Sequence, residues 1–208
     1  MKILHLDSSI LGEASASRVL SAAVVEQLRT SHPAAQLNVR DLAQTPVAHL
    51  DGAIAAGFRS PDVVVDDAAV RAEHVLSETL VSELLASDVI VLGVPMYNFS
   101  VPSQLKAWLD RIAQPGRTFR YTEAGPVGLS GDKAVVVAST RGGMYSTGPA
   151  EVMDHQESYL KAFFGFLGIQ RVHFIRAELL TKGAELRSKS MREALDRIPA
   201  VVAELFPN

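Results

Sequence analysis

The sequence predicts a doubly wound α/β fold with a five-stranded parallel sheet in the order 2-1-3-4-5 and helices on both faces. Short apolar runs that read as strands alternate with helical patterns along the chain, which is typical of βαβ units. Two of these runs contain enough Val and Ile to be buried on both faces, as central strands of a parallel sheet are. A length of 208 residues fits one domain spanning 1–208.

Five strands are expected. In chain order they are Lys2 to Asp7, Gln36 to Arg40, Asp88 to Val94, Lys133 to Ala138 and Arg171 to Arg176. The Val and Ile content of the third and fourth strands places those two at the centre of the sheet.

Five helices are expected between and after the strands. Two segments, Ser17 to Thr30 and Ala69 to Leu85, repeat apolar residues near helical spacing. Further helices are expected at Pro102 to Ala113, Glu151 to Leu167 and Lys182 to Leu205. Right-handed crossovers distribute them over both sheet faces. The stretches Leu42 to Asp67 and Gln114 to Asp132 read as irregular, and loops of that length are usually functional or disordered.

The composition excludes several classes of function. Hydrophobic residues make up 48% and charged residues 21%, as in a globular protein, and the net charge of −3 with scattered basic residues argues against nucleic-acid or membrane partners. Because the chain has no cysteine, disulfides, thiolate metal sites and cysteine nucleophiles are excluded, so redox chemistry would need a cofactor. We expect no metal site. The chain starts directly in a strand and has no apolar stretch of about 20 residues, which predicts a cytoplasmic location.

Ligands of such sheets bind beyond the carboxyl ends of the strands. After the first strand, Ser8, Ser9, Ser15 and Ser17 lie just before a helix, so hydroxyl and N–H groups can converge on a phosphate monoester. The alternative is that Ser15 or Ser17 only caps the helix. The loop has neither a dinucleotide-binding glycine motif nor a P-loop motif.

The loops after the third and fourth strands suit a flat ring. Met96, Tyr97, Asn98 and Phe99 place thioether, phenol, amide and phenyl groups together at a strand end, although either aromatic taken singly is compatible with an ordinary core edge. The glycine pair after Arg141 lets the backbone approach a ligand closely, and the alternative there is a plain turn.

Together, these motifs resemble the FMN-dependent NADH-azoreductase family, flavodoxin-like quinone and azo reductases. The resemblance is carried by Ser9, Ser15-Ala16-Ser17, Pro95-Met96-Tyr97-Asn98-Phe99 and Arg141-Gly142-Gly143. It continues through Val39-Arg40-Asp41-Leu42, Gln104-Leu105-Lys106, Thr118-Phe119-Arg120-Tyr121-Thr122-Glu123 and Phe164-Gly165-Phe166-Leu167-Gly168-Ile169, and so covers nearly the whole chain.

The resemblance implies a set of site residues for noncovalently bound FMN. Ser9, Ser15, Ala16 and Ser17 would bind the phosphate; Met96, Tyr97, Asn98 and Phe99 would line the flavin ring; Thr140, Arg141, Gly142 and Gly143 would complete the ring site. Family members commonly have Ser where Thr140 stands. Tyr121 and Phe163 match the aromatic residues that the family places over the open flavin face, where substrate binds.

The resemblance also implies a function, namely that of a homodimeric oxidoreductase. With NADH or NADPH as donor, it would reduce azo compounds and quinones by two-electron steps in a ping-pong mechanism, and no protein side chain would act as the catalytic acid or base. A flavodoxin-type one-electron carrier is the alternative, disfavoured by the near-neutral charge and the two long loops. A receiver-type signalling domain is excluded, because Pro95 stands where it needs an aspartate.

Overall fold

A single parallel sheet forms the centre of the molecule. The computed structural model describes residues 1–59 and 66–206. The sheet consists of five strands: β1 (Lys2–Asp7), β2 (Gln36–Asp41), β3 (Val89–Pro95), β6 (Ala134–Thr140) and β7 (Arg171–Ala177). Its order is β2-β1-β3-β6-β7 and every pairing is parallel. Counted among themselves, the strands have the expected order 2-1-3-4-5, and the Val-rich β3 and β6 are fully buried.

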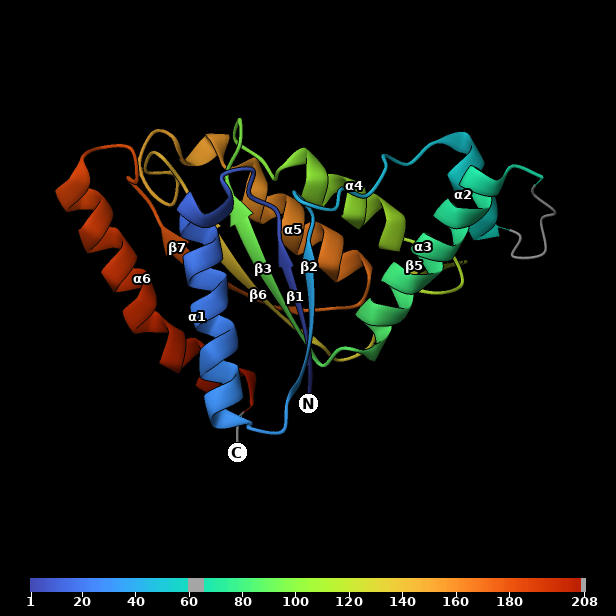
Figure 1. Ribbon diagram of the computed structural model, residues 1–208, viewed down its shortest axis with the longest axis horizontal. Coiled ribbons are helices and arrows are strands. Elements are labelled where there is room, and N and C mark those ends of the chain that lie inside the picture. Colours follow the sequence, from blue (N-terminus) through green and yellow to red (C-terminus); the bar gives the residue numbers. More distant parts are fainter. Residues whose placement is uncertain (60–65, 207–208) are drawn as a thin grey trace.

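Helices cover both faces of the sheet (Figure 1). On one face lie α1 (Ala16–Ser31) and α6 (Ala184–Leu205); on the other lie α3 (Ala68–Ala86), α4 (Ser103–Ile112) and α5 (His155–Phe166). Alternate residues of each inner strand join one of two apolar clusters, for example Val89 and Val91 under α1, and Ile90 and Leu92 under α3 and α4. This pattern follows from the two-residue period of a strand, and the flavodoxin-like arrangement is confirmed.

The helix expected over Glu151 to Leu167 starts later than expected. A short 3-10 turn, η2 (Glu151–Met153), comes first, and α5 begins at His155. Asp154 sets this start, because its carboxylate accepts hydrogen bonds from Gln156 N at 3.0 Å and Glu157 N at 3.1 Å.

The expectation of an irregular stretch over Leu42 to Asp67 is wrong for residues 52–59, which form α2 (Gly52–Arg59). Asp51 Oδ1 accepts from Ile54 N at 2.8 Å, Ile54 is buried, and His74 Nε2 of α3 lies 2.9 Å from Ala53 O. Contacts with α3 therefore stabilise a helix whose two glycines disfavour it locally. Residues 60–65 of that stretch lie outside the described residues.

The expectation of an irregular stretch over Gln114 to Asp132 is also wrong in part. It contains an antiparallel hairpin of β4 (Phe119–Thr122) and β5 (Gly125–Gly128). Phe119 is buried in the main core, and the backbone of Gly128 lies directly on that of Gly168, so a Cβ added at Gly128 would come within 2.0 Å of Gly168 N. The hairpin is therefore fixed to the junction between α5 and β7.

Candidate functional site

Three loops meet beyond the carboxyl ends of β1, β3 and β6, which are adjacent strands. Backbone hydrogen bonds join them: Ser8 N donates to Gly93 O at 3.2 Å, and Met96 N donates to Thr140 O at 2.8 Å. The loop residues proposed from the sequence are thereby brought to one end of the sheet, at the top of Figure 1.

The first loop gathers buried hydroxyl groups at the start of α1. Ser9, Ser15 and Ser17 are all buried, and Ser15 Oγ lies 3.0 Å from Ser17 Oγ. Ser15 also caps the helix, accepting from Arg18 N at 3.4 Å, so the capping alternative and the cluster of hydroxyls both hold for this residue. Ala16 and Ser17 begin the helix, where backbone N–H groups have no intrahelical acceptor. Hydroxyls and free N–H groups at a helix start are a donor set suited to a phosphate.

Tyr97 joins the first loop to the second. Its hydroxyl lies 3.4 Å from Ser9 Oγ and accepts a hydrogen bond from Ile10 N at 3.3 Å. The phenol therefore lies between the serine cluster and the residues at the end of β3. Its hydroxyl group connects the polar groups of the first loop to the second loop.

The second loop is a two-residue hairpin turn. Tyr97 N donates to Ser100 O at 3.0 Å and Ser100 N donates to Tyr97 O at 3.1 Å, while Asn98 and Phe99 have φ angles of 46° and 71°. Two consecutive positive φ angles indicate a type I′ turn. A phenylalanine in this region carries backbone strain, and such strain is concentrated at functional sites. The turn exposes the amide of Asn98 and leaves the Phe99 ring 39% exposed.

The third loop, which follows β6, brings the backbone of two glycines next to the turn after β3. Gly142 and Gly143 are half-buried, and among the described residues neither N–H group has a hydrogen-bond acceptor. A hollow of 210 Å³ lies between this loop and the second, lined by Met96, Asn98, Phe99, Gly142 and Tyr145. Thr140 is buried at the end of β6 and contributes its carbonyl to Met96.

Tyr145 is a lining residue that sequence reasoning missed. Its ring lies 6.1 Å from that of Phe99, edge-on, and a Cβ added at Gly143 would lie 3.1 Å from it. The signal available in the sequence was an aromatic residue two positions after the glycine pair.

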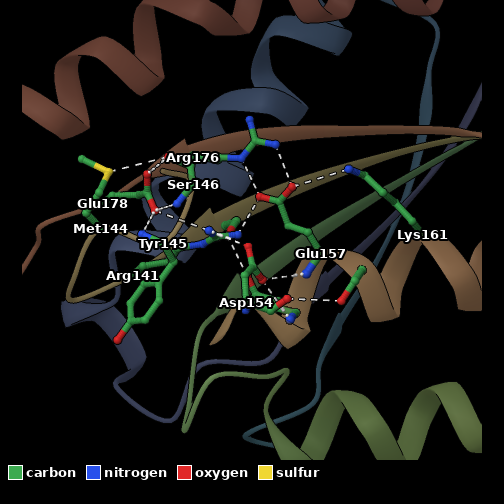
Figure 2. A network of polar contacts seen from close by, with 12 residues as sticks. Arg141, Met144, Tyr145, Ser146, Asp154, Glu157, Lys161, Arg176 and Glu178 are labelled. Atoms are coloured by element: carbon green, nitrogen blue, oxygen red, sulfur yellow. Dashed lines mark hydrogen bonds and ion pairs between the residues drawn. The ribbon is translucent and has the colours of Figure 1, made fainter. Parts of the chain in front are cut away.

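Arg141 is placed differently from the other residues proposed from the sequence. Its side chain is fully buried and points into a cluster of carboxylates formed by Asp154, Glu157 and Glu178 (Figure 2). Arg141 is not among the residues that line the hollow. Its backbone N–H donates to Ala177 O at 2.9 Å.

Tyr121 and Phe163 do not line the hollow either. Tyr121 lies on β4 and is 73% exposed, and its ring contacts only Phe119 among described aromatic residues, at 5.4 Å. Phe163 lies on α5 and packs against Tyr159 and Phe164, at ring distances of 6.1 and 5.6 Å. Within one chain, neither of these two aromatic side chains is brought to the three loops.

A charged cluster of Arg18, Asp7 and Asp41 contacts the first loop. The Arg18 guanidinium contacts Asp41 at 2.6 Å and Asp7 at 3.7 Å, and donates to Ser9 O at 3.2 Å. The hydrogen bond between Arg18 and Asp41 lowers the pKa of the Asp41 carboxyl and raises the pKa of the Arg18 guanidinium. Arg18 was not singled out from the sequence, where an arginine three residues after a helix cap has no distinguishing pattern.

The described residues contain neither a metal-binding cluster nor a membrane-spanning helix. Within residues 1–59 and 66–206, no group of three or more His, Asp or Glu side chains is arranged to bind a metal ion. In the same residues, no helix is both long enough and apolar enough to cross a bilayer.

Comparison with known proteins agrees with this geometry. A protein-family model described as "Flavodoxin-like fold" matches residues 1–202. A protein of Ralstonia nicotianae named FMN-dependent NADH:quinone oxidoreductase is 64% identical over 93% of each chain. A protein of Xanthomonas euvesicatoria named FMN-dependent NADH:quinone oxidoreductase 2 is 57% identical over 97% of this chain and 94% of that one.

Among solved structures, an azoreductase from Bacillus anthracis superposes with a TM-score of 0.88 at 24% identity, covering 98% of this chain and 99% of that one. This likeness shows the fold, and the family match and the close relatives confirm the resemblance found in the sequence. The chain therefore belongs to the flavodoxin-like fold family, with relatives named FMN-dependent NADH:quinone oxidoreductases.

Proposed function

We propose that this chain is an FMN-dependent NADH:quinone oxidoreductase that also reduces azo compounds. The observation that carries the proposal is the meeting of three loops at one end of the sheet. There the buried serine hydroxyls are linked through Tyr97 to the turn that lines a hollow with aromatic side chains and free glycine N–H groups. Relatives that share more than half of the residues carry this activity in their names.

The donor chemistry of the loops fits FMN. Ser9, Ser15 and Ser17, with the first N–H groups of α1 at Ala16 and Ser17, would hold the phosphate. Met96, Tyr97, Asn98 and Phe99 would contact the ring on one side and Thr140, Gly142 and Gly143 on the other, where glycine N–H groups can donate to ring carbonyls.

The chemistry that bound FMN supplies is acceptance of a hydride from the nicotinamide and donation of two electrons to the acceptor. The residues of the chain would bind the phosphate and orient the ring through these contacts, and one ring face would stay exposed. Because donor and acceptor would use the same exposed ring face, each must leave before the other binds. Initial-rate plots at several acceptor concentrations should then give parallel lines, and intersecting lines would contradict this order.

The test of the function is direct. Flavin released from purified protein by heat should run as FMN in chromatography, and anaerobic NADH should bleach the visible flavin absorption, which a quinone should then restore. FAD, or no flavin bound at saturating FMN, would refute the proposal. Turnover without a partner protein separates this enzyme from a flavodoxin-type carrier, the alternative that the relatives do not favour. Comparing NADH with NADPH as donor establishes the coenzyme preference.

A homodimer with a shared site is part of the proposal. The hollow is open, and Tyr121 and Phe163 lie outside it within one chain, while Ile10 and Leu11 expose large apolar side chains beside the serine cluster. A second copy would cover these residues and bring aromatic groups over the flavin. Sedimentation should give about twice the chain mass of 22.4 kDa. A fully active species of single-chain mass would refute the shared site.

Two broader expectations stay predictions. Both core clusters share one sheet, which supports a single domain over 1–208, and a single cooperative unfolding transition would test it. Cell fractionation would test the expected cytoplasmic location.

A further inference from the structure

Arg141 lies at the centre of a buried polar network (Figure 2). No part of its side chain is exposed, and its guanidinium contacts Asp154 at 2.8 Å, Glu157 at 2.6 Å and Glu178 at 3.4 Å. Its Nε donates to Ser139 Oγ at 3.0 Å. The planar guanidinium thus meets partners from several directions, which a lysine ammonium on the same stem does not reproduce.

Each of two carboxylates fixes a different segment. Glu178 accepts from Tyr145 N at 2.7 Å and from Ser146 N at 3.0 Å, and it also accepts from the Ser146 hydroxyl. Asp154 accepts from the first N–H groups of α5. Through these two residues the single guanidinium joins the loop after β6 to the start of α5.

The start of α5 in turn contacts the turn after β3. His155 N, next to Asp154, donates to Phe99 O at 3.0 Å. The network therefore connects both walls of the hollow, because Phe99 belongs to one wall and Gly142 and Tyr145 belong to the other. In Figure 2 the Tyr145 ring projects away from the charged groups, so its backbone belongs to the network while its side chain does not.

Stability alone is a weak explanation for this network. Three carboxylates share two closely bound arginines, Arg141 and Arg176, and the desolvation of buried ions offsets much of their attraction. Apolar side chains of similar size at these positions would give the folded protein about the same stability. By contrast, directional hydrogen bonds of this kind fix the orientation of the residues that contact a ligand.

We propose that Arg141 is a positioning residue: its buried guanidinium, bound to Asp154 and Glu178, sets the separation between the Gly142–Gly143 backbone and the Phe99 turn, and so sets the fit of the flavin ring between them. This inference rests on the proposed function. The proposal assigns to Arg141 no contact with the flavin. It predicts that replacing the planar guanidinium weakens binding of the flavin ring and leaves the phosphate contacts intact.

The test compares Arg141→Lys with Arg111→Lys. Arg111 is the matched control, because it is also fully buried and contacts a carboxylate, Glu73 at 2.8 Å, but it lies on α4 outside the three loops. The probes are FMN and riboflavin, which has the same ring without the phosphate. Dissociation constants come from fluorescence titration of the flavin-free protein, and the visible spectrum of bound flavin and the melting temperature are recorded for each variant.

Arg141→Lys should weaken both flavins by a similar factor of about tenfold, the effect of losing ~1.4 kcal/mol of ring contacts, and should shift the visible band of bound flavin. Arg111→Lys should lower the melting temperature but leave both dissociation constants within about twofold of wild type. Unchanged flavin affinity and spectrum in Arg141→Lys would overturn the proposal, as would a loss confined to FMN. If wild type binds neither flavin, the proposed function fails instead.

A second variant covers the case in which Arg141→Lys does not fold. Glu178→Gln keeps the shape of the side chain and removes its charge, which weakens its bonds to Arg141 and to the backbone of Tyr145 and Ser146. The dissociation constants of FMN and riboflavin should rise together in this variant. A folded Glu178→Gln protein with wild-type affinity and spectrum would equally overturn the proposal.

Discussion

Arg18 of α1 and Asp41 at the end of β2 form an ion pair with 2.6 Å between Nη1 and Oδ2, and the same guanidinium donates to the carbonyl of Ser9. An edge strand, a helix start and the serine loop are therefore joined by one side chain. Both partners are mostly buried, so the pair is screened less than an exposed one.

This pair makes stability depend on pH in a defined direction. Because the hydrogen bond from Arg18 lowers the Asp41 pKa below its ordinary value of 3.8, the carboxylate contributes stability above that pH and loses it as the pH falls through the lower folded-state value. Asp41→Asn should cost roughly 1–3 kcal/mol in the free energy of unfolding at neutral pH, and the difference from wild type should shrink in acid. Denaturant unfolding measured from pH 7 down to about pH 2 spans this range. An equal difference at all pH values would contradict the assignment.

Replacing Ser15 and Ser17 together by Ala should weaken FMN binding, because each hydrogen bond to a charged group contributes roughly 1.5–3 kcal/mol. Riboflavin binding should change little. Since Ser15 also caps α1, the variant will lose some stability, and Asp67→Ala is the control: it removes the cap of α3, where Asp67 accepts from Ala69 N at 2.7 Å. If both variants lose the same FMN affinity, the serines act only through folding.

Phe99→Gly should separate stability from binding. It places a glycine directly after Asn98, which gives the Asn-Gly pair that type I′ turns prefer, and it removes a side chain held at a φ of 71°. The free energy of unfolding should stay equal or rise by about 1 kcal/mol, while flavin affinity falls with the loss of the ring. Calorimetry and flavin titration on the same preparation test both parts. A stable variant with unchanged flavin affinity would remove Phe99 from the site.

Gly93→Ala should destabilise the protein strongly. Gly93 lies in the middle of β3, and an added Cβ would fall 2.2 Å from Asp7 Oδ1, which itself accepts from Ser21 Oγ at 2.8 Å. We expect a loss of roughly 1–3 kcal/mol in the free energy of unfolding. Asp7→Ala removes the clashing atom, so the double variant should be more stable than the sum of the single losses predicts. Strict additivity would show that β3 shifts instead.

Strands and most helices could be predicted because their signals are local. The Val-rich runs of β3 and β6 and the apolar spacing of α1 are visible in single segments. The hairpin was missed because Gly125-Pro126-Val127-Gly128 has loop composition, and it is stabilised by packing against Gly168, about 40 residues away in the sequence. The helix α2 was missed for a similar reason, since contacts with α3 stabilise it.

The arrangement of the candidate site was predictable for residues that are contiguous in the sequence, and it was not predictable where distant segments determine the direction of a side chain. The serines of the first loop and the residues 96–99 are compact motifs, and the structure brings them together. The inward orientation of Arg141 depends on Asp154, Glu157 and Glu178, which come from three places in the sequence, so no local pattern distinguishes it from an arginine that faces a ligand.

The contact between Gly128 and Gly168 has a consequence for how this scaffold tolerates change. Since bare backbone meets bare backbone there, any side chain at position 128 would lift the hairpin and displace Tyr121 with it. The tip between β4 and β5 has no such restriction. Substitutions at the exposed tip should therefore leave the anchoring of the hairpin intact, whereas a side chain at either glycine would move the hairpin as a whole.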